Sequence, residues 1–256
     1  MRKIAGILLA VLILACKGKQ DKQGEVDSDP MAGAEGQVPP SKPMEDGWTV
    51  LFDGSSFDGW HIYNGEAVGE PWKLEDGAMI FDPSLIKSEG KHYNLVTDKE
   101  YTNFELSLEW MVTEGANSGV MWGVVEDEKY GEPYITGPEI QVLDNIGHPD
   151  GKNGPTRQAG ALYDMIPTDS TAVKPVGEWN HFVITINHET NEGSVVLNDN
   201  TVAEFPVNGE AWDDMVSKSK FADWEAFGKF KTGKIALQHH GEPIVIGYRN
   251  IKIKEL

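Results

Sequence analysis

The sequence predicts an antiparallel β-sandwich with one short helix. From residue 48 onward, apolar residues recur mainly at every second position, which is the pattern of half-buried strands. Gly, Asn, Asp and Pro separate these runs and supply the turns. Only residues 210–219 place their apolar side chains at helical spacing. Many short strands with one minor helix are typical of two packed antiparallel sheets.

The strands follow from the alternation. Residues 104–112 and 182–186 alternate most clearly, and residues 195–197 and 202–205 flank an Asn-Asp-Asn turn that predicts a hairpin. The other predicted strands are 48–53, 72–81, 93–97, 119–125, 138–144, 234–239, 243–248 and 250–255. Two loops, 126–137 and 145–178, are longer than most connections in compact domains, and such loops are often functional. Residues 48–256 are enough for one substantial core.

The N-terminus predicts export and a lipid anchor. Met1-Arg2-Lys3 is basic, and the apolar run Ile4–Ala15 is too short to span the hydrocarbon core of a bilayer. Ile13-Leu14-Ala15-Cys16 resembles a bacterial lipobox, although Leu14 is bulkier than usual at its position. An ordinary secretory signal beside a chance cysteine is the alternative. We expect residues 1–16 to be a lipoprotein signal peptide with acylated Cys16, which would leave the protein lipid-anchored in the bacterial cell envelope, in the periplasm or at the outer membrane.

Composition predicts a tether and argues against internal disulfides and nucleic-acid binding. Residues 17–47 are polar and rich in Gly, Pro, Asp and Lys, so they predict a flexible tether. Cys16 is the only cysteine, so the mature chain can form no internal disulfide. The formal charge of −19 repels polyanions and argues against nucleic acid as a partner. Solubility at a cell surface is a sufficient reason for that charge.

A polar cluster at 137–145 is the first candidate site. Strict alternation places Glu139 and Gln141 on one face of the strand and Asp144 on the other. A β-bulge between Gln141 and Asp144 would bring both carboxylates to one side. Glycosidases use such a pair as the acid and the nucleophile or base. A strand with a polar solvent face would give the same spacing.

A second cluster lies near the C-terminus. Gln238 and His240 share a face of an extended strand, so His240 could reach the cleft of Glu139 and Gln141. A structural or merely exposed histidine is an equally good interpretation. A divalent cation would need ligands such as Glu139, Asp144, His148 and Asp150, but no spacing here matches a known metal motif, so we expect neither metal nor other cofactor.

Aromatic residues favour a carbohydrate ligand. The chain has eight tryptophans, and Trp60, Trp72, Trp122, Tyr130, Tyr134 and Tyr163 lie in or beside predicted loops. Sugars place their C–H faces on aromatic rings and their hydroxyls on Asn, Gln, Asp and Glu. We expect most of these rings in the core and a minority in a cleft. The sequence has no phosphate-binding loop and no Gly-x-Ser-x-Gly elbow.

A series of short motifs along the chain is similar to the motifs of one known family and follows the same order. The motifs are Leu51-Phe52-Asp53-Gly54, Asp58-Gly59-Trp60, Glu109-Trp110, Asn117-Ser118-Gly119, Gly137-Pro138-Glu139, Asp144-Asn145, Gly147-His148-Pro149-Asp150, Ala159-Gly160-Ala161-Leu162-Tyr163, Lys174-Pro175, Gly177-Glu178-Trp179-Asn180, Ile235-Ala236-Leu237-Gln238, His240-Gly241 and Arg249-Asn250-Ile251-Lys252-Ile253. Together they resemble the 3-keto-disaccharide hydrolase domain family over residues 48–256. Two positions depart from it: His239 stands where aspartate is usual, and Arg157-Gln158 stands where many members have His-Arg.

The resemblance implies an all-β, concanavalin A-like jelly-roll sandwich that acts on glycosides oxidised at C3 of a glucose-like ring. A C3 ketone acidifies the C2 proton, so a base can remove it and the group at C1 can leave by elimination. Water then adds across the new double bond. Such a site needs a base near C2, a donor to the enolate oxygen and an acid for the leaving group.

These needs give the role assignments. We expect His240 as the base and Glu139 or Asp144 as the acid. The donors or sugar clamps are expected to be Gln141, Asn145 and Lys174. Further expected substrate contacts are Glu109, Trp110, Asn117, Arg157, Tyr163 and Gln238. Two other functions stay open: a lectin-like carbohydrate-binding module on the same sandwich, and a conventional endo-glucanase.

Overall fold

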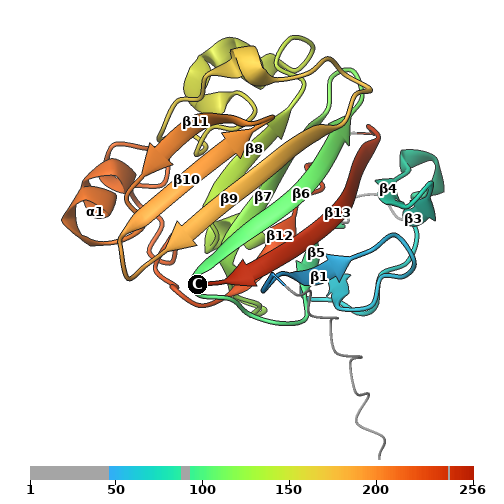
Figure 1. Ribbon diagram of the computed structural model, residues 1–256, viewed down its shortest axis with the longest axis horizontal. Coiled ribbons are helices and arrows are strands. Elements are labelled where there is room, and N and C mark those ends of the chain that lie inside the picture. The colour runs from blue at the N-terminus through green and yellow to red at the C-terminus, as the bar shows by residue number, and fades with distance from the viewer. Residues whose placement is uncertain (1–45, 88–92, 242) are drawn as a thin grey trace, which may run out of the picture. The chain divides into compact units, whose positions relative to one another are not determined.

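The computed structural model describes residues 46–87, 93–241 and 243–256 (Figure 1). The expected signal peptide, Cys16 and all of the expected tether except residues 46 and 47 lie outside the described residues. Within the described ranges, no helix is long and apolar enough to cross a membrane.

Two antiparallel sheets form the sandwich (Figure 1). The eight-stranded sheet has the order β11 (Asn200–Phe205), β10 (Glu192–Leu197), β9 (Asn180–Asn187), β6 (Phe104–Val112), β13 (Ile246–Glu255), β4 (Ala78–Phe81) and β3 (Trp72–Glu75), and β1 (Thr49–Phe52) also pairs with β13. The five-stranded sheet has the order β2 (Trp60–Ile62), β5 (Leu95–Thr97), β12 (Lys234–Leu237), β7 (Asn117–Val124) and β8 (Glu139–Leu143). The predicted all-β sandwich is therefore confirmed.

The helical elements are short. The one α-helix of the described residues, α1 (Gly209–Ser217), lies close to the predicted helix. The 3-10 helices there are η1 (Pro83–Leu85), η2 (Pro133–Ile135), η3 (Pro149–Asn153), η4 (Pro155–Arg157) and η5 (Ser170–Ala172). Most of them lie in the two loops that the sequence marks as unusually long.

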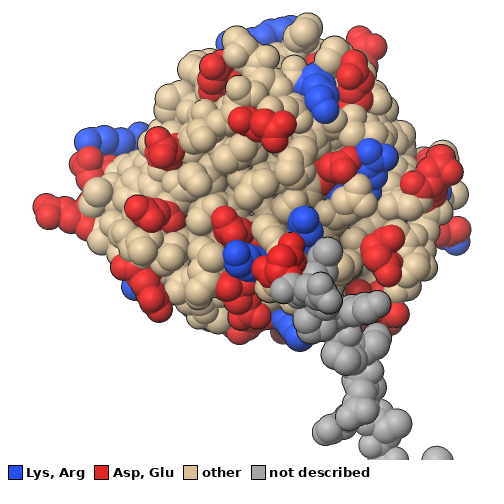
Figure 2. Space-filling view, viewed as in Figure 1, with Lys and Arg blue, Asp and Glu red and all other residues tan. Residues whose placement is uncertain are grey.

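The core fills the space between the sheets. Burial alternates along β6 and β9 as the period of two predicts. Trp110 of β6 packs against Phe182 of β9 with ring centres 5.3 Å apart, and Trp122 of β7 stacks on Phe205 of β11 across the sandwich at 6.0 Å. Figure 2 shows acidic side chains spread over the face of the eight-stranded sheet, with fewer basic ones among them. The negative charge is thus distributed over this face.

Three strand predictions need correction. Residues 72–81 form the hairpin β3–β4, because Asp76 and Gly77 adopt φ values of 50° and 74° and turn the chain. Residues 246–255 form one strand, β13, whose register shifts between Arg249 and Lys252 around Asn250, with φ 52°. β2 was not predicted because three residues are too few for alternation to be visible.

β7 and β8 are buried on both faces. Segment 158–163 runs beside β8: Gln141 and Ala161 pair through Gln141 N–H and Ala161 C=O at 3.0 Å, and Tyr163 N–H donates to Glu139 C=O at 3.0 Å. β8 is therefore not a free edge of the sheet, and Tyr163 is fixed next to Glu139.

Candidate active site

A cavity of about 290 Å³ opens on the face of the five-stranded sheet that points away from the other sheet. Val120 and Ile140 point into the core, so their neighbours on β7 and β8, Asn117, Glu139 and Gln141, point outward. The lining residues are Asn94, Asn117, Glu132, Tyr134, Glu139, Gln141, Tyr163, Lys220, Phe221, Trp224, Gln238, His239 and His240. We refer to this cavity as the amide pocket.

Glu139 is the most perturbed carboxyl of the amide pocket. Its side chain is 8% exposed and lies over Gly119, where any side chain would collide with the carboxylate. Burial raises the pKa of Glu139 to about 8, while the charge of Lys220 opposes this rise and that of Asp150 adds to it. Glu139 is therefore mainly protonated at neutral pH, as a general acid must be.

Three buried amides form the floor, and they give the pocket its name. Asn117, Gln141 and Gln238 are at most 3% exposed. Among the described residues, none donates a hydrogen bond to their side-chain oxygens. A buried acceptor without a donor costs about 1–3 kcal/mol, so these oxygens are suited to the hydroxyls of a ligand.

Aromatic rings form one wall. Phe221 and Trp224 meet edge to face at 5.2 Å, Tyr134 lies 6.0 Å from Trp224, and Tyr163 lies 6.5 Å from Phe221. Sugar C–H faces dock on such surfaces. Tyr134 and Tyr163 were among the aromatic candidates, whereas Trp60, Trp72 and Trp122 are core residues.

Lys220 stands on this wall. Its Nζ lies 4.1 Å from the ring centre of Tyr163 and 5.0 Å from that of Phe221. The residue as a whole is exposed, yet the surrounding groups remove enough water to lower the pKa of its ammonium. Of the described residues that line the amide pocket, it is the one lysine or arginine.

Arg157 supports the wall from behind. Its guanidinium bonds Asp164 at 2.7 Å and Asp150 at 3.2 Å, and Tyr163 donates its hydroxyl to Asp150 at 2.6 Å. Asp164 in turn accepts the backbone N–H of Lys220 at 2.8 Å. Arg157 thus positions Tyr163 and Lys220. It was expected to contact the substrate, but it does not line the amide pocket.

The two adjacent histidines differ. His240 is exposed at the pocket and meets the ring of His148 edge to face at 6.3 Å. His239 is 2% exposed and stacks on Phe81 with ring centres 4.1 Å apart. Its backbone N–H donates to Asn94 at 2.9 Å, which fixes the end of β12.

The predicted bulge in β8 is wrong. β7 and β8 pair without a register shift from Met121–Glu139 to Asn117–Leu143. Asp144 follows the strand, and its carboxylate accepts the N–H groups of Gly115 at 2.8 Å and Ile146 at 3.1 Å. These bonds hold the turn after β8, so Asp144 does not join Glu139 in the amide pocket.

Asp144, Asn145 and Lys174 line a separate cavity of about 650 Å³. Asn145 accepts the N–H of Ala159 at 2.8 Å, and Lys174 donates its ammonium to the carbonyl of Trp179 at 2.9 Å. The expected contacts of Asn145 and Lys174 with the same ligand as Glu139 are therefore not supported by their positions.

Glu109 and Trp110 belong to the other sheet. The carboxylate of Glu109 pairs with Arg249 at 2.6 Å and accepts from Asn250 at 2.8 Å, while Trp110 is fully buried in the core. Neither residue lines the amide pocket.

Sequence reasoning missed several lining residues, namely Asn94, Glu132, Lys220, Phe221, Trp224 and His239. Lys220, Phe221 and Trp224 come from an irregular segment after α1, where no periodicity indicates a role. The only available signal was the aromatic spacing of residues 221, 224 and 227, whose first and last rings stack at 3.8 Å.

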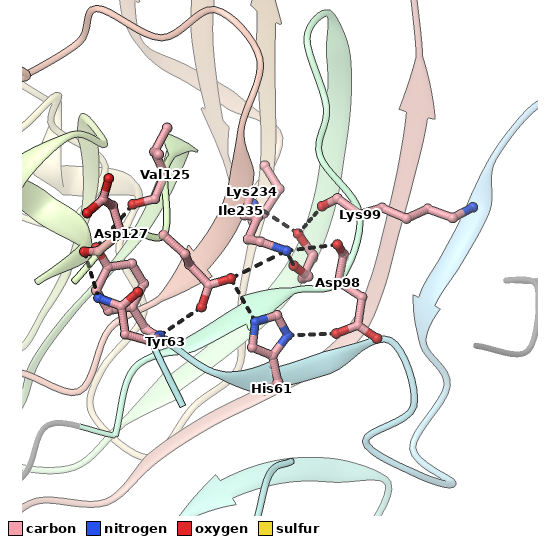
Figure 3. A network of polar contacts seen from close by, with 11 residues as sticks. His61, Tyr63, Asp98, Lys99, Val125, Asp127, Lys234 and Ile235 are labelled. Atoms are coloured by element: carbon pink, nitrogen blue, oxygen red, sulfur yellow. Dashed lines mark hydrogen bonds and ion pairs between the residues drawn. The ribbon is translucent and has the colours of Figure 1, made fainter. Parts of the chain in front are cut away.

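A charged cluster fixes the loop that brings Glu132 and Tyr134 to the pocket (Figure 3). His61 contacts Asp98 through Nδ1 at 2.6 Å and Glu126 through Nε2 at 2.9 Å. Lys234 lies 3.5 Å from the same Glu126 oxygen. Across the described ranges, no three His, Cys, Asp or Glu side chains are placed to hold a metal ion.

Comparisons with known proteins identify a family and a relative whose sequences match this chain. Residues 47–254 match the family described as 3-keto-alpha-glucoside-1,2-lyase-like domain. A Bacteroides thetaiotaomicron protein named 3-keto-disaccharide hydrolase is 35% identical, over 99% of this chain and 97% of its own length.

Two solved structures are also similar to this chain. A candidate glycosyl hydrolase from Parabacteroides distasonis is 30% identical, with a TM-score of 0.72 over 82% of this chain and 94% of its own. A Bacillus subtilis protein described as galectin-like in fold is 9% identical, with a TM-score of 0.51 over 77% of this chain and 89% of its own. The second likeness concerns the fold alone and fits the jelly-roll expectation.

Proposed function

The chain belongs to the family of 3-keto-alpha-glucoside-1,2-lyase-like domains, and from this premise we propose that it cleaves glycosides whose glucose-like ring carries a ketone at C3. A carbohydrate-active function follows from the family and the relatives. The observation that carries the finer proposal is the buried Glu139, whose pKa of about 8 keeps it protonated at neutral pH in a pocket floored by amides.

The proposed reaction has two stages. A base takes the C2 proton, the ketone oxygen becomes an enolate, and the enolate collapses to expel the C1 oxygen and leave a C1=C2 double bond. Water then adds its oxygen to C1 and a proton to C2, so that the net reaction is hydrolysis. The family description names a 1,2-lyase, which corresponds to the first stage. The Bacteroides relative is named a hydrolase, which corresponds to both stages together.

The acid, the base and the acceptors for ring hydroxyls each have a group in the amide pocket. Glu139 donates the proton to the leaving oxygen, because burial keeps its carboxyl neutral near pH 7. His240, at the exposed side of the pocket, takes the C2 proton. Asn117, Gln141 and Gln238 accept hydrogen bonds from ring hydroxyls. Asp144, which would have been the second carboxylate of a conventional glycosidase, lines another cavity.

The decisive experiment compares a 3-keto-disaccharide with its unoxidised parent. We expect the purified chain to consume only the keto-sugar. Glu139→Gln and His240→Ala should each lower kcat by about a hundredfold or more. The exposed Glu225→Gln is the matched control for the carboxylate and should leave kcat unchanged.

The other outcomes are distinct. Equal cleavage of the parent sugar would refute the elimination and favour a conventional endo-glucanase. Binding of both sugars with turnover of neither would favour a lectin-like module.

The place of action is proposed from the N-terminal sequence alone. The basic start, the apolar run and Cys16 support a lipid-anchored protein of the bacterial cell envelope. An anchored enzyme would meet sugars outside the cytoplasm, with the membrane contacted through the lipid only.

A further inference from the structure

The elimination needs a group that the expected residues do not supply. When the C2 proton leaves, its electron pair forms the C2=C3 bond and the ketone oxygen takes a negative charge. Gln141, Asn145 and Lys174 were expected as donors or sugar clamps, but Asn145 and Lys174 line a different cavity. The unsatisfied atoms of the floor amides are oxygens, which accept hydrogen bonds, and the amide nitrogen of Gln141 donates to the carbonyl of Arg157 at 3.4 Å.

Lys220 supplies a positive charge that meets this need, as the one lysine or arginine among the described residues that line the amide pocket. Its ammonium lies 4.1 Å from the ring centre of Tyr163, on the aromatic wall that would hold the sugar face. Its charge interacts with that of Glu139, and both residues line the amide pocket. An ammonium near a developing oxyanion acts most strongly where water is partly excluded.

The backbone of Lys220 is held in place before any substrate arrives. Its N–H donates to Asp164 at 2.8 Å, and the guanidinium of Arg157 holds Asp164 at 2.7 Å. The next residue, Phe221, stacks on Phe227 at 3.8 Å with the planes only 7° apart. A donor whose backbone is held in this way needs little rearrangement when negative charge develops on the substrate.

We propose that Lys220 is a catalytic residue that binds the C3 carbonyl oxygen of the substrate and stabilises the enolate through its ammonium. The ammonium keeps its protons and forms no covalent bond with the sugar. This proposal rests on the proposed function, because an unoxidised sugar has no C3 carbonyl to polarise.

The test uses the full chain and a 3-keto-disaccharide, with Lys220→Met, Lys220→Arg and a control, Lys218→Met. Lys218 is exposed, pairs with Asp214 at 2.6 Å and does not line the pocket. We expect Lys220→Met to lose kcat by about 10²–10³, the usual effect of removing one oxyanion donor, with a smaller change in KM. Lys220→Arg keeps the positive charge and should restore at least a tenth of the activity, and Lys218→Met should match the wild type.

A second readout separates enolate formation from bond cleavage. Exchange of the C2 hydrogen with deuterium from D2O should slow in Lys220→Met by the same factor as kcat, because both need the enolate. A merely structural role would lower the melting temperature and leave exchange per folded molecule unchanged, which would overturn the proposal.

Two further results would also be decisive. Turnover by Lys220→Met equal to the wild type would overturn the role of Lys220 while leaving the proposed function intact, whereas an inactive wild type would refute the proposed function itself. If borohydride attached the sugar covalently to Lys220, by reducing an imine formed between its amine and the C3 ketone, the non-covalent role would be overturned.

Discussion

Glu139→Gln should make the chain more stable at alkaline pH, whatever substrate the protein acts on. The substitution replaces a buried acid by an amide of nearly the same shape that carries no charge at any pH. In the wild type, burial raises the pKa of Glu139 from 4.5 to about 8. Ionisation in the folded state is therefore opposed, while ionisation in the unfolded chain is not.

The sign and size follow from this difference. A group whose pKa is raised by folding contributes its full stability below the unfolded pKa and loses it as the pH rises through the folded pKa. Between pH 5 and pH 9 the wild type should lose about 4 kcal/mol through Glu139 alone. For a domain of this size that corresponds to roughly 10 °C in Tm.

The assay is thermal unfolding of the wild type and of Glu139→Gln from pH 5 to pH 9. We expect the two Tm values to be close at pH 5 and to separate steadily above it, with the variant higher. Glu204→Gln, an exposed change on β11, should follow the wild type throughout. Parallel curves for wild type and Glu139→Gln would show that Glu139 ionises freely and would refute the assignment of a buried acid.

Three further predictions test other parts of the molecule. Gly119→Ala should abolish most turnover and cost about 1–3 kcal/mol of unfolding free energy, because its methyl group would collide with Glu139; wild-type kinetics would contradict the packing. Trp224→Ala should raise KM by about tenfold with kcat nearly constant, since the ring supplies a binding surface; a fall in kcat alone would count against that role. Cys16→Ser should abolish incorporation of labelled lipid, and normal labelling would refute the anchor.

Sequence reasoning located the half of the site that lies on regular strands. Glu139 and Gln141 share an outward face because side chains alternate along a strand, and Gln238 directly follows β12. Asp144 was misplaced because a bulge was assumed in order to bring two carboxylates together. The turn after β8 instead uses that carboxylate to satisfy backbone N–H groups.

The other half of the site was beyond prediction from the sequence. Lys220 and Trp224 lie on an irregular segment far along the chain from Glu139, and tertiary packing alone brings them to the pocket. No local pattern indicates which face of a loop meets a sheet. The role of Arg157 was likewise hidden, because its partners Asp150 and Asp164 are brought to it by turns.

The double burial of β7 and β8 ties the evolution of activity to that of stability. On β8, Ile140 and Val142 fill the core, while Glu139 and Gln141, each one peptide bond away, face the ligand cavity. A mutation that repacks the core shifts the same β8 backbone that positions Glu139. Variants selected for a more stable core will therefore tend to displace the Glu139 carboxyl from its place in the site. New substrate preferences are more readily acquired on the segment around Trp224, where an altered side chain changes the wall without moving either sheet.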